Sequence, residues 1–269
     1  MTPQHDRPSR RTVLGSILAG ASAGLAGCAG LGATGSDVIT SIDVDGTDLV
    51  LTIEPNKIDA VNVITPSGEL FRERTIASGA SQRRIPIGVS YSPGEYEIIV
   101  LSDGETVATS SVTLEPELEL TELRLGRDHP EAMYDGARLA STNSEAILTV
   151  TNHGTGPTAV TALRFEGDVP YPISDKDDRY IDSGIYDERR GFGEATAIRV
   201  PAREAVVFYS NTEPFSPIFV REKCDLVGEG GEFIVRLITS QEHNIANEYS
   251  IHYHDHNSEA CDFEIEDSE

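Results

Sequence analysis

The sequence has no tryptophan, only two methionines and only three cysteines among 269 residues. Met133 is the sole methionine after Met1, and the sequence shows no Cys-His-Met pattern of the kind that binds copper in electron-transfer proteins. The cysteines show no Cys-x-x-Cys spacing, which argues against a zinc ribbon or a redox motif. Also absent are a Gly-x-Ser-x-Gly elbow, a lysine-containing Gly-rich phosphate loop and a His-Glu-x-x-His pair. These absences favour a protein that is not an enzyme and uses no cofactor.

Positive charge is scarce, with 21 basic against 45 acidic residues and a formal net charge of −24. Only three of the basic residues are lysines. A strongly acidic protein repels phosphate groups, so we expect neither nucleic acid nor an anionic membrane surface as a partner. The hydrophobic fraction of 38% is nevertheless sufficient for one or two folded cores.

The N-terminus has the organisation of a targeting segment. Arg10 and Arg11 precede an uncharged run of small and aliphatic residues, Gly15–Ala26, and Cys28 follows shortly after it. The run is shorter than the ~20 residues that a membrane-spanning helix needs. A basic segment, a short apolar segment and small residues at a cleavage site, in this order, predict a cleaved signal peptide over residues 1–27.

Two motifs in this leader resemble known export signals. The paired Arg10 and Arg11 resemble a twin-arginine signal. Leu25-Ala26-Gly27-Cys28 resembles the lipobox of bacterial and archaeal lipoproteins. This resemblance implies that a lipid on Cys28 anchors the mature protein at the outer face of the cell membrane. Residues 28–36, which are mostly small, are then a flexible tether, and the expected localisation is extracytoplasmic.

Removal of the leader makes the remaining chain more acidic. Residues 1–27 contain three of the basic residues and one of the acidic residues, so the mature chain carries a net charge of −26. Such a charge destabilises a compact state in dilute buffer, but molar salt screens it over ~3 Å. Acidic excess, few lysines and the leader together resemble an exported lipoprotein of a halophilic archaeon.

Alternating apolar residues predict strands and turns, without sustained helical periodicity. Residues 37–116 contain about seven such strands, which fits an immunoglobulin-like β-sandwich. Pro93-Gly94-Glu95-Tyr96 resembles the turn and tyrosine that enter a late strand in immunoglobulin-like and fibronectin-like domains. Residues 117–269 predict a second, larger sandwich. Its strand Ala146–Asn152 and Gly-rich turn His153–Pro157 resemble adhesion-type modules of prokaryotic surface proteins. The expected fold class is all-β, with two consecutive sandwiches.

Residues 167–194 lack clean periodicity and are predicted to be an insertion in the second sandwich. Tyrosine and arginine are enriched at interfaces, so this loop is a candidate binding surface. The alternative is a solvated insertion packed over one sheet edge. The candidate contact residues are Tyr171, Tyr180, Tyr186, Arg189 and Arg190.

The other cysteines and a histidine cluster lie near the C-terminus. With Cys28 assigned to lipid, Cys224 and Cys261 are an even pair in an extracytoplasmic chain, which predicts a disulfide. If the segment Tyr249–His256 is an extended strand, the side chains of His252, His254 and His256 point to one face. Neighbouring imidazoles of this kind can share zinc or copper, whereas an exposed strand end is the alternative.

These patterns predict a lipid-anchored, non-enzymatic binding or structural module at the surface of a halophile. The expected partner, beyond the membrane lipid at Cys28, is a surface protein or a glycan. Two alternatives stay open at this point: a metal-binding envelope lipoprotein that uses the histidine face, and an accessory subunit of an envelope complex.

Overall fold

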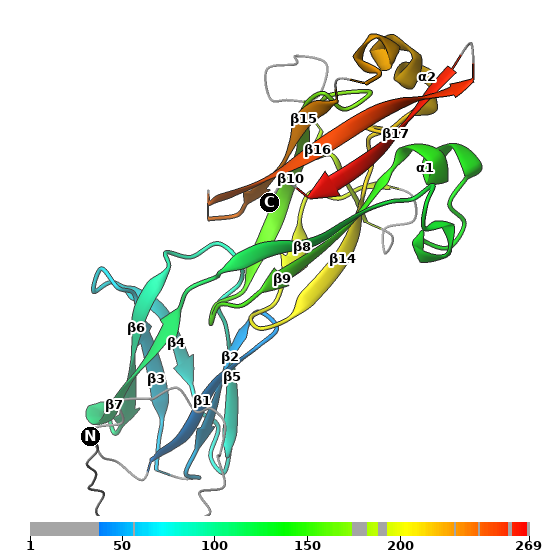
Figure 1. Ribbon diagram of the computed structural model, residues 1–269. Coiled ribbons are helices and arrows are strands. Elements are labelled where there is room, and N and C mark those ends of the chain that lie inside the picture. The colour runs from blue at the N-terminus through cyan, green and yellow to red at the C-terminus, as the bar shows by residue number, and fades with distance from the viewer. Residues whose placement is uncertain are drawn as a thin grey trace, which may run out of the picture. The chain divides into compact units, whose positions relative to one another are not determined.

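The computed structural model describes residues 38–55, 57–173, 182–187, 193–228, 230–241, 243–257 and 260–267. Strands dominate these residues and the helices are short (Figure 1). The expected all-β fold class is therefore confirmed. The signal peptide with Arg10 and Arg11, the cysteine Cys28 and the tether lie outside the described residues. None of the helices described is long and apolar enough to cross a membrane.

The first seven strands form two sheets around one hydrophobic core, and we call this part the N-terminal sandwich. The sheet orders are β1-β2-β5 and β4-β3-β6-β7. On β2, the alternation read from the sequence places Leu49, Leu51 and Ile53 in the core. The strands are β1 (Ile39–Asp45), β2 (Asp48–Ile53), β3 (Ala60–Ile64), β4 (Leu70–Thr75), β5 (Gln82–Pro86), β6 (Gly94–Ser102) and β7 (Glu105–Leu114).

Tyr96 makes a tyrosine corner at the start of β6. Its ring is fully buried, and its hydroxyl donates a hydrogen bond of 2.9 Å to the carbonyl oxygen of Ser92. Gly94 has a φ of +140°, and a Cβ at that position would lie 2.8 Å from Cγ of Pro66. A tyrosine near the start of such a strand, bonded to backbone a few residues upstream, is a hallmark of immunoglobulin-like sandwiches. The turn-and-tyrosine prediction is thus confirmed.

The remaining strands form a second pair of sheets, which we call the C-terminal sandwich. Their orders are β12-β11-β14-β9-β8 and β13-β10-β15-β16-β17. The strands are β8 (Leu118–Leu125), β9 (Ala146–Asn152), β10 (Thr158–Gly167), β11 (Ile185–Asp187), β12 (Gly193–Glu194), β13 (Ile198–Val200), β14 (Ala205–Ser210), β15 (Gly231–Thr239), β16 (Asn244–Asn257) and β17 (Ala260–Asp267). The helices are α1 (Leu139–Ser144), α2 (Pro217–Val220) and the 3-10 helices η1 (Pro130–Ala132) and η3 (Arg221–Leu226).

A cluster of phenylalanines fills the core of the C-terminal sandwich. Phe215 is almost fully buried and lies 5.6 Å from Phe165 and 5.7 Å from Phe263, measured between ring centroids. Phe215 does not belong to a strand but to the connection after β14. This connection is therefore anchored in the core.

Asn152 explains why the predicted Asn-and-glycine turn forms after β9. Its buried amide accepts hydrogen bonds from the backbone N–H groups of Glu117 and Gly154, at 3.1 and 3.0 Å. It donates to the carbonyl oxygens of Gly156 and Val200, at 2.9 and 3.3 Å. One side chain thus satisfies backbone groups from three segments.

The two hydrophobic cores involve different parts of the sequence. One uses residues between positions 42 and 114, and the other uses residues between positions 120 and 263. The boundary near Pro116 falls between these ranges, and the domain limits themselves stay a prediction.

Candidate binding surface

The three longest connections of the C-terminal sandwich leave it at one end. They follow β8, β10 and β14 and span positions 126–145, 168–184 and 211–230, of which 174–181 and 229 lie outside the described residues. Antiparallel pairing places the end of β8 beside the start of β9, and the end of β14 beside the starts of β9 and β11. In the other sheet it places the end of β10 beside the start of β15. We call this end the loop end. Helices α1 and α2 lie in two of its connections (Figure 1).

The loop end exposes apolar side chains. Ile218 on α2 and Leu139 on α1 are 78% and 76% exposed, the two highest values among the large apolar side chains of the described residues. Beside Ile218 in sequence, Phe219 stacks on Tyr171 with 4.3 Å between ring centroids. The backbone N–H of Tyr171 donates to the carbonyl oxygen of Pro214, which joins two of the connections. These side chains offer apolar area for contact with a partner.

The predicted loop residues have different surroundings. Tyr171 is half-buried in the stack with Phe219. Tyr186 on β11 is only 8% exposed and stacks on Tyr134 with 4.4 Å between ring centroids. Tyr186 therefore supports the loop end by packing. The other three candidates, Tyr180, Arg189 and Arg190, lie outside the described residues.

Tyr134 links the connection after β8 to the sheet and to a buried acid. Its ring packs edge-to-face on the ring of Tyr209, with 5.1 Å between ring centroids. Its hydroxyl donates to Oε1 of Glu145 over 3.4 Å. Glu145 is 8% exposed. Burial raises the pKa of Glu145 to about 7; hydrogen bonds from Ser141 and Tyr134 oppose the rise and the negative charge of Glu213 adds to it.

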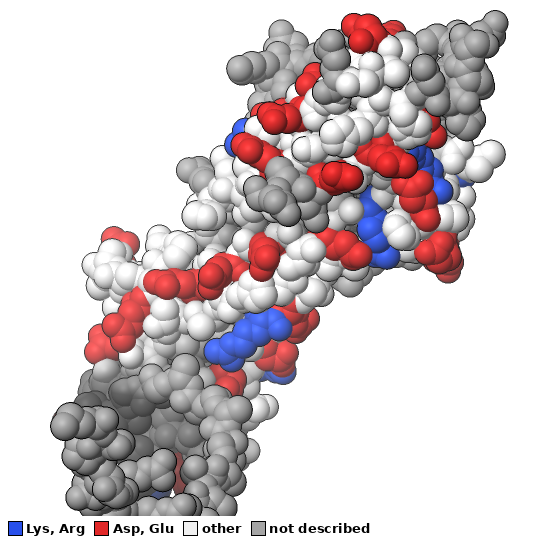
Figure 2. All heavy atoms as spheres, viewed as in Figure 1, with Lys and Arg blue, Asp and Glu red and all other residues white. Residues whose placement is uncertain are grey.

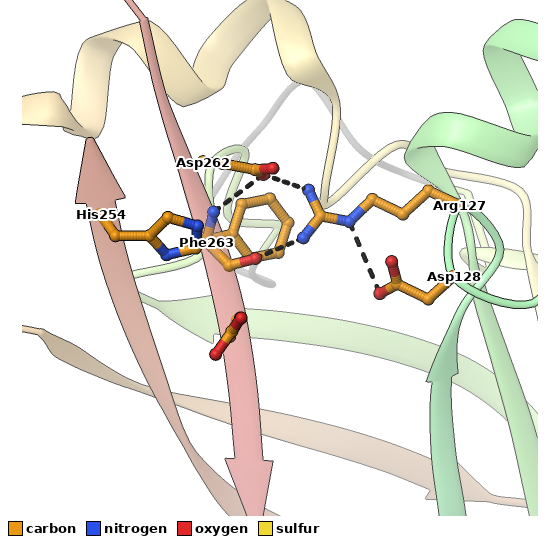
Figure 3. Close-up of a pocket in the computed structure, with 6 residues that line it drawn as sticks. Arg127, Asp128, His254, Asp262 and Phe263 are labelled. Atoms are coloured by element: carbon orange, nitrogen blue, oxygen red, sulfur yellow. Dashed lines mark hydrogen bonds and ion pairs between the residues drawn. The ribbon is translucent and has the colours of Figure 1, made fainter. Parts of the chain in front are cut away.

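A polar hollow of about 440 Å³ lies beside this region, where β8 ends near β16 and β17. Figure 3 shows Arg127 reaching Asp262 and Phe263 on β17. The guanidinium donates to Oδ1 of Asp262 over 2.6 Å and to the carbonyl oxygen of Phe263, and it lies 3.9 Å from the centroid of the Phe263 ring. Arg127 therefore joins the connection after β8, an edge strand of one sheet, to β17, an edge strand of the other, and we call these contacts the Arg127 clamp. The hollow is lined by Arg127, Asp128, His254, Asp262, Phe263 and Glu264.

The clamp uses the positive charge of Arg127 internally. Burial raises the pKa of Asp262, but the N–H of Phe263, the guanidinium of Arg127 and the charge of His254 outweigh it, so that the pKa is lowered. Arg127 also lies 3.6 Å from a carboxylate oxygen of Asp128. Because both acids occupy the guanidinium, the hollow offers little attraction to an anionic ligand.

The structure describes the side chains of two of the three histidines that the sequence suggests as metal ligands. His252 and His254 are exposed on β16, and the register pairs them with Glu264 and Asp262 of β17. The side chain of His256 lies outside the described residues. In the part of the chain that the structure describes, no three His, Cys, Asp or Glu side chains are arranged to hold a metal ion. Metal binding at this face stays a prediction.

Cys224 lies on η3, half-buried, with its sulfur 3.6 Å from the carbonyl oxygen of Val220. It is a disulfide-bonded cysteine. Helix η3 packs against β16 and β17. The side chain of Cys261, at the start of β17, lies outside the described residues, so the pairing of these two cysteines stays a prediction.

Sequence reasoning missed most residues of this region. It found Tyr171, Tyr186 and His254, whereas Leu139, Ile218, Glu145 and the Arg127 clamp had no signal in the pattern. Figure 2 shows acidic side chains spread along the visible face, with few basic ones among them. The charged side chains of the visible face are thus mostly acidic, as the composition predicts, whereas the loop end also exposes the apolar side chains of Leu139 and Ile218.

A three-plus-four strand sandwich with a tyrosine corner defines the chain as an immunoglobulin-like all-β protein. No family model and no curated protein matches the sequence. The two-domain fibronectin type-III segment of chicken tenascin has 12% identity over 79% of this chain and 98% of its own, with a TM-score of 0.28. The human OSCAR ligand-binding domain has 11% identity over 88% and 96%, with a TM-score of 0.20.

A glycosyl hydrolase family 2 member from Bacteroides cellulosilyticus also matches, with 13% identity over 76% of this chain and a TM-score of 0.20. This chain spans 24% of the length of that enzyme. The fold assignment rests on the sheets and the tyrosine corner rather than on these likenesses.

Proposed function

We propose that the protein is an exported, lipid-anchored binding module whose partner contacts the loop end. The observation that carries this proposal is the gathering of the three longest connections and of exposed Leu139 and Ile218 at one end of the C-terminal sandwich. Immunoglobulin-like sandwiches present variable loops from one end of a rigid scaffold, and such loops are common binding sites.

The sequence supports the place of action. A lipid on Cys28, after export directed by Arg10 and Arg11, would hold the module at the outer face of the membrane. The net charge of −26 on the mature chain suits a medium of high salt, in which self-repulsion is screened.

We favour a surface protein over a glycan as the partner. The aliphatic side chains of Leu139 and Ile218 gain free energy by burial against apolar groups, which hydroxyl-rich sugars provide less well. In this proposal the module is not an enzyme. The polar hollow beside the Arg127 clamp supports this view, because its guanidinium is paired with Asp262 and Asp128.

We also propose that Cys224 pairs with Cys261. The contact of η3 with β17 supports this pairing. A bridge across the intervening residues would stabilise the C-terminal sandwich by ~4 kcal/mol in the chain-entropy account.

A capture experiment in molar salt tests the binding proposal. The purified protein is immobilised and incubated with surface proteins from its own host, beside a variant that combines Leu139→Ser and Ile218→Ser. Leu70→Ser is the matched control, since Leu70 is 56% exposed on β4 of the N-terminal sandwich. We expect one specific partner that the double variant loses and the control retains. Equal recovery by all three proteins would contradict a partner at the loop end.

A further inference from the structure

One acidic residue differs from the others in its surroundings. Among the side chains that the structure describes, Glu145 is the only Asp or Glu in the buried class. Oε2 of Glu145 is fully buried and has no hydrogen-bond partner. A buried carboxylate oxygen without a partner costs free energy unless a charge or a donor reaches it.

Two hydrogen bonds from backbone N–H groups place a polar loop directly against Glu145. On one side of it, the N–H of Ala146 donates to Oγ of Ser210 over 3.0 Å. On the other side, the N–H of Phe215 donates to the carbonyl oxygen of Ser144 over 3.1 Å. The residues between Ser210 and Phe215 must therefore pass beside Glu145.

This loop carries further oxygen atoms of the same kind. Oδ1 of Asn211 and Oγ1 of Thr212 are buried and have no hydrogen-bond partner. Glu213 follows them, and its charge acts on Glu145. Three of the seven unpartnered buried side-chain atoms found in the described residues thus belong to Glu145 and the loop that passes it.

We propose that Glu145, Asn211 and Thr212 form a cation site for calcium, with Glu213 adding negative charge at its outer side. Calcium accepts carboxylate, amide and hydroxyl oxygens in flexible geometry and keeps water molecules in its remaining positions. Zinc, in contrast, prefers nitrogen and sulfur ligands, which this site does not contain. Magnesium requires a stricter octahedral geometry that a short loop provides less readily.

The site would join two of the chain segments that form the loop end. Glu145 ends the segment that contains α1, and the loop with Asn211 precedes α2. A bound cation would tie these segments together and relieve the repulsion between Glu145 and Glu213. This inference does not depend on the proposed partner, because it concerns groups beneath the exposed surface.

Tyrosine-sensitised terbium luminescence tests the site directly. Terbium takes the same oxygen ligands as calcium, and the hydroxyl of Tyr134 lies 3.4 Å from Oε1 of Glu145, close enough for energy transfer. The full chain is freed of metal with a chelator and titrated with Tb³⁺ in molar NaCl, which weakens binding to surface acids. We expect a saturable signal that Ca²⁺ displaces and that an equal concentration of Mg²⁺ displaces less.

Three variants assign the signal. Glu145→Gln should weaken Tb³⁺ and Ca²⁺ binding about 100-fold, because it removes the charged ligand. Thr212→Val should weaken binding about tenfold, because it removes an uncharged oxygen ligand. Glu204→Gln removes the same charge from an exposed position in the turn before β14 and should leave binding unchanged. Circular dichroism checks that each variant is folded.

The site does not exist if the native protein shows no saturable sensitised signal. Equal weakening by Glu145→Gln and Glu204→Gln would mean surface binding only and would also overturn the proposal. If Glu145→Gln does not fold, Thr212→Val decides, and an unchanged affinity of that folded variant refutes the assignment.

Discussion

Replacement of Arg127 by methionine should destabilise the C-terminal sandwich by about 2 to 3 kcal/mol. The charge-assisted hydrogen bond to Asp262 contributes only about 1 kcal/mol, because the carboxylate is 39% exposed and partly screened. The hydrogen bond to the carbonyl of Phe263 contributes about 1 kcal/mol and the contact with its ring about 0.5 to 1 kcal/mol. For a sandwich of this size the melting temperature should fall by roughly 5–10 °C.

Thermal and urea unfolding in molar salt measure this change, with Arg84→Met as the matched control. Arg84 pairs with Asp45 and Asp48, but its side chain is 52% exposed, so the control should show no resolvable change. The reasoning is refuted if the folded Arg127→Met protein melts at the temperature of the control.

The pH dependence gives an independent check of the clamp. The pKa of Asp262 is lowered in the folded protein, so its ionised form contributes stability above its unfolded pKa near 3.8. This contribution is lost as the pH falls through the lower folded pKa. The difference in stability between the native protein and Arg127→Met should therefore narrow below about pH 4. A constant difference across the acid range would show that Asp262 does not act through the clamp.

Four further results are expected. Asn152→Ala should destabilise the C-terminal sandwich by about 3 kcal/mol in urea unfolding, because four hydrogen bonds of a buried side chain are lost; an effect below 1 kcal/mol would contradict the structural role of the amide. Cys28→Ser should release the protein from membranes in fractionation of its host, and retention would place the anchor elsewhere. Transfer from molar to ~0.1 M salt should lower the melting temperature, and an unchanged value would remove the inference of a halophilic origin. A non-reducing peptide map should contain one Cys224–Cys261 fragment, and a different partner for Cys224 would refute the pairing.

The sequence could predict those parts of the fold that depend on local pattern. Strand alternation on β2 and the turn before Tyr96 involve neighbours in sequence, and the structure has both. Helices α1 and α2 have six and four residues, too few for a helical period to emerge in a window of ordinary length. The Arg127 clamp joins residues that are 135 positions apart, and no spacing rule connects them.

Composition misleads most where the same residue type is abundant. With 45 acidic residues in the chain, a single glutamate has no individual signal in the sequence. What separates Glu145 from the others is its burial, and burial arises because the Phe215 ring enters the core and draws the connection after β14 across the start of β9. The packing of one apolar side chain thus leads the loop with Asn211 and Thr212 past Glu145. To predict this arrangement, a sequence pattern would have to include both Phe215 and Glu145, which are 70 positions apart. A variant that keeps Glu145 but loosens the anchor, Phe215→Ala, should therefore lose terbium binding as well as stability.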